Sequence, residues 1–102
     1  YGEGDTIVCV EDILSAIKVS KANSNICTVP LLGSSVSPEL EKVILERFKN
    51  VIIWLDRDKA TYAVKQARNM VAKGLNCSVL VTQDDPKEYS VGEINEWLKS
   101  KL

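Results

Sequence analysis

Residues 51–58 read VIIWLDRD, so that five consecutive apolar residues are followed by Asp56, Arg57 and Asp58. Similar apolar runs occur at 7–10 (IVCV), 26–29 (ICTV) and 79–81 (VLV). The runs are continuous rather than alternating, which is typical of strands buried on both faces of a parallel sheet. They therefore predict a sheet of about four parallel strands.

Helical patterns separate and follow these runs, at about 13–22, 37–48, 59–74 and 90–98. Ser37 and Pro38 are an N-cap followed by proline at the first helical position. Gly74 is placed to end the third helix, and Ser90 with Glu93 forms a capping box for the fourth. The alternation predicts a single α/β domain of Rossmann-like type, with helices on both faces of the sheet.

The length of 102 residues is that of one domain, residues 1–102. The apolar fraction of 45% and the charged fraction of 26% are those of a globular protein, which excludes disordered and fibrous classes. Because the chain opens on Tyr1 rather than on methionine, we expect a domain excised from a longer protein.

Thirteen basic and fourteen acidic residues give a net charge of −1. A module that binds nucleic acid by bulk electrostatics is normally clearly basic, so any such contact here needs a local site or neighbouring domains. The chain has no histidine, which excludes Ser-His and Cys-His triads, imidazole bases and histidine-ligated zinc.

The three cysteines, Cys9, Cys27 and Cys77, are odd in number and widely spaced inside apolar runs. This pattern builds neither a C-x-x-C pair nor a disulfide framework. It predicts core thiols in a reducing compartment, the cytoplasm. No run approaches the roughly 18 apolar residues of a membrane span, so we expect no membrane partner.

Acidic residues follow three of the four predicted strands: Glu11 and Asp12 the first, Asp56 and Asp58 the third, and Asp85 the fourth. Function in open parallel sheets collects at the carboxyl ends of the strands. On an extended chain Asp56 and Asp58 point to the same side, and Glu11 faces them from a neighbouring strand. Carboxylates gathered in this way are costly without a cation, and their hard oxygens suit Mg²⁺ or Mn²⁺.

Each of these residues also has a structural interpretation. Asp58 is placed to cap a helix that begins at Lys59, and Asp12 is placed to cap the first helix, which we favour for Asp12. Asp85 is either a further metal ligand or an ordinary loop acid. Arg57 and Lys59 belong to a solvated face, unless one of them meets a phosphate beside the acids.

Four motifs occur in an order that resembles the Toprim domain. They are a glutamate motif (8–16, VCVEDILSA), a glycine turn (32–35, LGSS), a D-x-D motif (52–60, IIWLDRDKA) and Asp85-Pro86, which is similar to the Lys-Asp-Pro element of primases. Toprim domains occur in bacterial and phage-type primases, in type IA and II topoisomerases and in some nucleases. The resemblance covers essentially the whole chain.

The chain departs from the family pattern at four positions. Asp12 replaces the glycine after the glutamate, and Ser15 replaces an aspartate that primases usually carry. Thr61 replaces a glycine that often follows the D-x-D motif, and Asp84 replaces the lysine before Asp85. Glu11, Asp56 and Asp58 are unchanged.

The resemblance implies metal-dependent phosphodiester chemistry, with Glu11, Asp56 and Asp58 as catalytic acids that also bind Mg²⁺ or Mn²⁺, and Asp85 as a further metal ligand. It is greatest to the DNA primase domain of primase-helicases. The implied partners are a DNA template, nucleoside triphosphates and neighbouring primase or helicase domains. A Toprim nuclease or topoisomerase module remains an alternative, although no tyrosine has the context of a topoisomerase nucleophile.

Two alternatives belong to other classes. In a phospho-receiver signalling domain, Glu11 and Asp12 would bind Mg²⁺, Asp56 would accept the phosphoryl group and Thr82 would assist. The chain lacks the fifth strand and its lysine that receivers carry, and Asp58 has no role in them. In a degenerate domain the acids would serve only structure.

Overall fold

The computed structural model describes residues 4–23, 25–31 and 36–101. The strands are β1 (Thr6–Val10), β2 (Cys27–Pro30), β3 (Asn50–Asp56) and β4 (Asn76–Thr82). The helices are α1 (Ile13–Ala22), α2 (Pro38–Arg47), α3 (Ala60–Ala72) and α4 (Val91–Lys99). Two short 3₁₀ turns, η1 (Arg57–Lys59) and η2 (Pro86–Glu88), follow β3 and β4.

The four strands form one sheet in the order β2-β1-β3-β4, and every pair is parallel. Val8 of β1 pairs with Thr28 of β2 and with Ile52 of β3. At the carboxyl edge, Asp56 of β3 pairs with Thr82 of β4. The predicted parallel sheet is confirmed, and its order makes β1, β3 and β4 consecutive neighbours.

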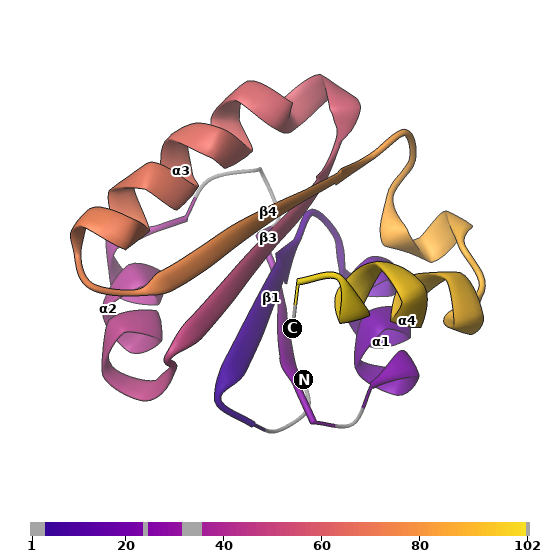
Figure 1. Cartoon of the computed structure of the whole chain (residues 1–102), viewed down its shortest axis with the longest axis horizontal. Coiled ribbons are helices and arrows are strands. Elements are labelled where there is room, and N and C mark those ends of the chain that lie inside the picture. The colour runs from indigo at the N-terminus through magenta and orange to yellow at the C-terminus, as the bar shows by residue number, and fades with distance from the viewer. Residues whose placement is uncertain (1–3, 24, 32–35, 102) are drawn as a thin grey trace.

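Helices cover both faces of the sheet, as predicted (Figure 1). On one face, α2 and α3 bury Ile44, Ala63, Ala67 and Met70 against the strands. On the other face, α1 and α4 bury Ala16, Val19, Ile94 and Leu98. Strand residues buried on both faces need apolar side chains in succession, which is why β1 and β3 read as continuous apolar runs.

The helix boundaries follow local signals. Ser37 accepts a hydrogen bond from the backbone of Leu40 at the start of α2, and the capping box of Ser90 and Glu93 is complete. Gly74 has a φ of +96°, a conformation that favours glycine, just beyond α3. The fourth strand begins at Asn76 rather than at 79, because backbone pairing with β3 extends the ladder through polar residues that the apolar pattern does not mark.

The core contains an anchored tryptophan and a buried thiol. Trp54 of β3 is fully buried, and its indole Nε1–H donates to Thr82 Oγ1 at 3.0 Å. Cys9 in β1 is also fully buried, and burial raises the pKa of its thiol to about 12. No disulfide joins the three cysteines, in agreement with the sequence prediction. Across the described ranges, no helix has the length and apolarity needed to cross a membrane.

Candidate metal centre

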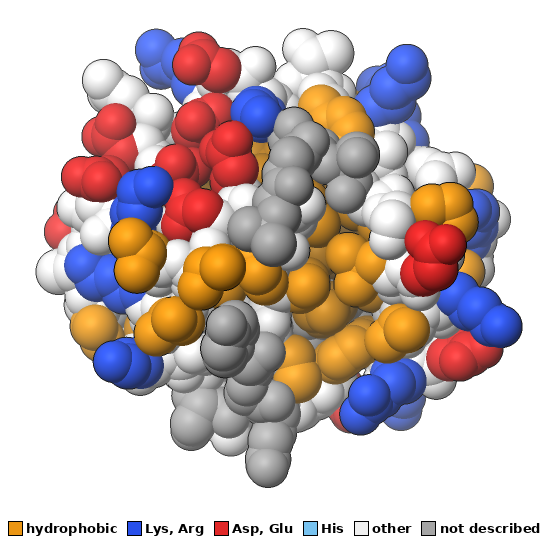
Figure 2. Space-filling model, turned by 180° about the vertical axis from the view of Figure 1, so that it is seen from behind, with side chains coloured by type: hydrophobic (Ala, Val, Ile, Leu, Met, Phe, Trp, Pro, Cys, Tyr) orange, Lys and Arg blue, Asp and Glu red, His pale blue; other side chains and the backbone are white. Residues whose placement is uncertain are grey.

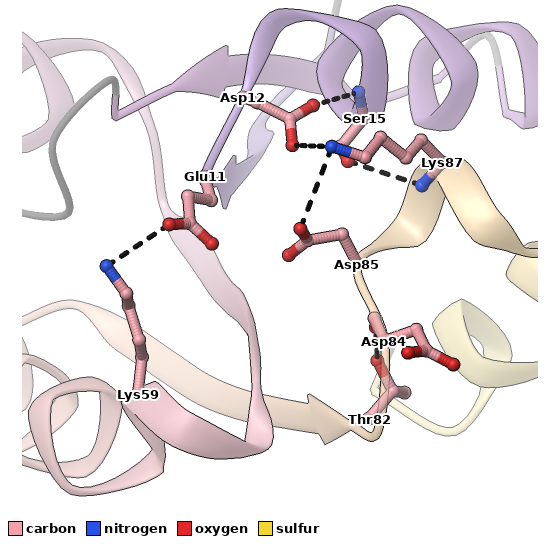
Figure 3. Close-up of polar contacts among 8 residues, drawn as sticks. All are labelled: Glu11, Asp12, Ser15, Lys59, Thr82, Asp84, Asp85 and Lys87. Carbon is pink, nitrogen blue, oxygen red and sulfur yellow. Dashed lines mark hydrogen bonds and ion pairs between the residues drawn. The ribbon is translucent and has the colours of Figure 1, made fainter.

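Three carboxylates meet at the carboxyl edge of the sheet. Glu11 directly follows β1, Asp56 is the last residue of β3, and Asp85 follows β4 immediately before η2. Carboxylate oxygens of these three residues all lie within 4.8 Å of one another. Figure 3 shows the side chains of Glu11 and Asp85 pointing into the same space, and Figure 2 shows acidic side chains gathered in one region at the upper left. The strand order brings together acids that lie far apart in the sequence.

The cluster has more negative charge than its protein partners neutralise. All three acids are partly buried, and Oδ1 of Asp56 and Oδ1 of Asp85 are buried with no hydrogen-bond partner among the described residues. A buried carboxylate oxygen without a partner carries a desolvation cost. A bound divalent cation would offset this desolvation penalty. Hard carboxylate oxygens are the ligands that Mg²⁺ and Mn²⁺ prefer. The donor set therefore fits such an ion.

The electrostatics of Asp85 reflect this crowding. Its pKa is raised from 3.8 to about 6, first by burial and then by the negative charges of Glu11, Asp56 and Asp12, while Lys87 acts in the opposite direction. Proximity of like charges and loss of solvent both disfavour the ionised form. A bound cation would therefore lower the pKa of Asp85 and favour its ionised form.

Asp58 lies outside this group. The premise that residues 56–58 stay extended is wrong, because the chain turns into η1 directly after Asp56. Asp58 is exposed, and its side chain makes no hydrogen bond or ion pair with the residues that the structure describes. The capping interpretation is also wrong, since α3 begins at Ala60 with Lys59 at its N-cap. A ligand role for Asp58 stays a prediction.

Asp12 caps α1, as its structural interpretation predicted. Its Oδ1 accepts a 2.8 Å hydrogen bond from the Ser15 backbone N–H, and its Oδ2 lies 2.8 Å from Lys87 Nζ. Burial raises the pKa of Asp12, but the hydrogen bonds from Lys87 and Ser15 outweigh burial and hold it below its usual value. Asp12 is therefore paired and charged, whereas Oδ1 of Asp56 and Oδ1 of Asp85 have no hydrogen-bond partner in the described part of the chain.

Lys87 links the turn η2 to α1 (Figure 3). Besides Asp12, its ammonium lies 3.9 Å from Asp85 Oδ2, and its backbone N–H donates to Ser15 Oγ at 3.2 Å. Sequence reasoning missed this residue. Lys87 stands 75 positions from Asp12, and nothing in a single sequence marks a contact of that range.

Lys59 is the second lysine beside the cluster. Its Nζ lies 3.1 Å from Glu11 Oε1. The sequence suggested Lys59 as a possible phosphate contact; in the structure its partner is one of the three clustered acids. The predicted glycine turn at 32–35 lies outside the described residues.

A solved structure described as the "DnaG primase catalytic domain bound to ssDNA" is similar to this chain. The match has a TM-score of 0.70 and 19% sequence identity, and it covers 98% of this chain. The chain has a Toprim-like fold. It spans about a third of the solved chain, 35% of its length. No protein-family model and no curated protein sequence matches it.

Two departures from the Toprim pattern meet in this Toprim-like fold. Asp12 and Ser15 both contact Lys87, through its ammonium and its backbone N–H respectively. A glycine at position 12 would have no side chain to make either the helix cap or the ion pair. The substituted residues therefore form one linked contact that holds η2, and with it Asp85, against α1.

The phospho-receiver alternative finds little support at Thr82. Its hydroxyl is buried, accepts from Trp54 Nε1–H and donates to the Asp84 carbonyl oxygen at 2.6 Å. Both of its hydrogen-bonding functions are thus used inside the fold. The sheet has four strands in the described ranges, so the fifth strand of a receiver is not found there.

Proposed function

We propose that the chain is the catalytic Toprim domain of a DNA primase, a nucleotidyltransferase that synthesises RNA primers on a DNA template during replication. The observation that carries the proposal is the convergence of Glu11, Asp56 and Asp85 within 4.8 Å at the carboxyl edge of the sheet. The fold shared with a primase catalytic domain supports it.

In this proposal Glu11, Asp56 and Asp85 hold Mg²⁺ or Mn²⁺, and Asp58, whose side chain is exposed, is a further catalytic acid and metal ligand. The bound cation would supply electrostatic stabilisation of charge on the reacting phosphate. The chain's own part is to fix the carboxylates: Glu11 and Asp56 at the ends of two adjacent central strands, and Asp85 immediately before the turn that Lys87 ties to α1. Such chemistry needs no histidine, and the chain has none.

The proposed partners are a DNA template and nucleoside triphosphates. A net charge of −1 gives the domain little general attraction for a polyanion. Neighbouring primase or helicase domains of a longer protein would therefore hold the template. Three cysteines without a disulfide support a reducing compartment, the cytoplasm.

The test is a primer-synthesis assay on the protein that contains this domain, with single-stranded template, ribonucleotides and Mg²⁺. Asp56→Asn should abolish synthesis while the fold is retained, and Asp84→Asn, an exposed neighbour of the cluster, is the matched control. Template degradation or DNA relaxation without synthesis would instead support the nuclease or topoisomerase alternative. A beryllofluoride response that requires Asp56 would support the phospho-receiver.

A further inference from the structure

Lys59 approaches the acidic cluster from the start of α3, opposite to Lys87 (Figure 3). Its ammonium pairs with Glu11 Oε1 at 3.1 Å, and the two side chains are 30% and 27% exposed. An ion pair with that much exposure is weak, typically below about 1 kcal/mol. Lys59 is therefore held at the cluster by a contact that a stronger ligand can replace.

Glu11 has two competing uses for the same carboxylate. It belongs to the group of three acids that fits a divalent cation, and it is also the partner of Lys59. A divalent cation that takes this carboxylate removes the partner of Lys59. The ammonium would then lie beside a cationic centre without its carboxylate partner, and an anion bound there would stabilise it.

The surroundings of Lys59 favour an anion. Lys59 is the N-cap of α3, and no side chain among the described residues caps this helix. The dipole of a helix favours negative charge near its N-terminus. A surface hollow of about 490 Å³ on α3 is lined by Ala60, Thr61, Val64, Lys65 and Arg68. Lys65 and Arg68 add two cations to the surface of this helix.

We propose that Lys59 is an exchangeable counter-ion: it pairs with Glu11 while no divalent cation is present, and binds a phosphate group of the substrate once a cation occupies the carboxylates. This inference rests on the proposed function. The ligand is a phosphate oxygen, supplied either by a nucleoside triphosphate or by the phosphodiester backbone of a nucleic acid strand.

The inference predicts that removing the charge of Lys59 raises the affinity for Mn²⁺ and lowers the affinity for phosphate. Lys59→Met removes the competitor for Glu11, so Mn²⁺ should bind about two- to five-fold more tightly, the range expected for loss of an exposed ion pair. The same variant should bind phosphate about ten-fold more weakly in excess Mg²⁺, because a charge-assisted contact is lost. Lys59→Arg keeps the charge and should stay close to wild type in both measurements.

Both quantities are measurable on the 102-residue chain. Free Mn²⁺ is followed by electron paramagnetic resonance, and anion binding by calorimetry in excess Mg²⁺, with inorganic triphosphate in one arm and a short single-stranded oligonucleotide in the other. Lys73→Met is the matched control. It removes the same charge at the other end of α3, where Lys73 pairs with Glu41 on α2. Urea unfolding establishes that each variant is folded, and Lys59→Gln replaces Lys59→Met if the latter is not.

The outcomes separate this inference from the proposed function. If Asp56→Asn leaves Mn²⁺ binding of the chain unchanged, both the metal centre and the role of Lys59 are refuted. If Asp56→Asn weakens Mn²⁺ binding but the Lys59 variants match Lys73→Met, only the role of Lys59 is refuted. Loss of affinity in one anion arm alone identifies the source of the phosphate, and no loss in either arm overturns the inference.

Discussion

Replacement of Asp85 by asparagine should stabilise the metal-free protein at neutral pH. The carboxylate lies beside Glu11 and Asp56, its Oδ1 is buried without a hydrogen-bond partner among the residues that the structure describes, and its contact with Lys87 is long, at 3.9 Å. Asparagine has nearly the same shape and no charge. The substitution therefore removes repulsion and desolvation and sacrifices one weak ion pair.

The magnitude follows from the pKa of Asp85. A rise from 3.8 to about 6 corresponds to roughly 3 kcal/mol of unfavourable free energy when the carboxylate is ionised. The side chain is 18% exposed, so solvent screening lowers this figure, and we expect a measured gain of about 1–3 kcal/mol. The folded-state pKa exceeds the unfolded one, so the penalty is absent below pH 3.8, grows between pH 3.8 and 6, and is complete above pH 6.

The assay is urea unfolding of wild type and Asp85→Asn at pH 4 and pH 7.5 in the presence of EDTA, followed by tryptophan fluorescence. Asp84→Asn removes the same charge from the exposed neighbouring position and should change the free energy of unfolding by less than about 0.5 kcal/mol. At pH 4 the gain of Asp85→Asn should almost vanish. Addition of Mg²⁺ at pH 7.5 should stabilise wild type more than the variant, because a ligand of the native state shifts the equilibrium toward it.

Two results would refute this reasoning. If Asp85→Asn destabilises the metal-free protein at pH 7.5, the carboxylate makes a favourable contact that outweighs the crowding. If the gain is the same at both pH values, it does not arise from the ionisation of Asp85.

Three further predictions concern stability and are checked by urea unfolding at neutral pH. Asp12→Ala should cost about 1 kcal/mol or more, since it removes the cap on the Ser15 N–H, whereas Asp12→Asn keeps an acceptor there and should cost less; equal losses would contradict the cap. Thr82→Val should cost about 1–3 kcal/mol by leaving the buried Trp54 Nε1–H without its acceptor, and a neutral result would show that this hydrogen bond contributes nothing. Ile53→Ala, at a fully buried position of the central strand β3, should cost about 2–5 kcal/mol, and a loss below 1 kcal/mol would contradict its core position.

The sequence predicted the fold well because burial on both sides of a parallel sheet demands continuous apolar runs. β1 and β3, whose core residues are covered on both faces, have such runs. β4 is an edge strand, and its first residues, Asn76 to Ser78, are polar or small. Their strand conformation depends on pairing with β3, a segment elsewhere in the chain, so their own sequence does not predict it.

The sequence predicted the candidate site only through the acidic residues that follow the predicted strands. Glu11 and Asp56 were placed together because parallel neighbours end at the same edge. Asp58 was placed by the spacing of an extended chain, and that spacing fails because the chain turns into η1. Asp85 was also placed at this edge, because it follows the fourth strand, and it lies with Glu11 and Asp56. The contacts of Lys87 that tie η2 to α1 join segments more than 70 positions apart, and local sequence pattern does not encode them.

The burial of Cys9 makes its thiol a probe of the opening of the sheet. This thiol lies in β1, between β2 and β3, with no exposed surface. With its pKa at about 12, it is uncharged at neutral pH and hidden from any reagent until neighbouring strands separate. Cys27 and Cys77 lie in the edge strands β2 and β4 and are only partly buried. The order in which the three thiols are alkylated therefore reports whether the sheet frays from its edges or opens as a whole.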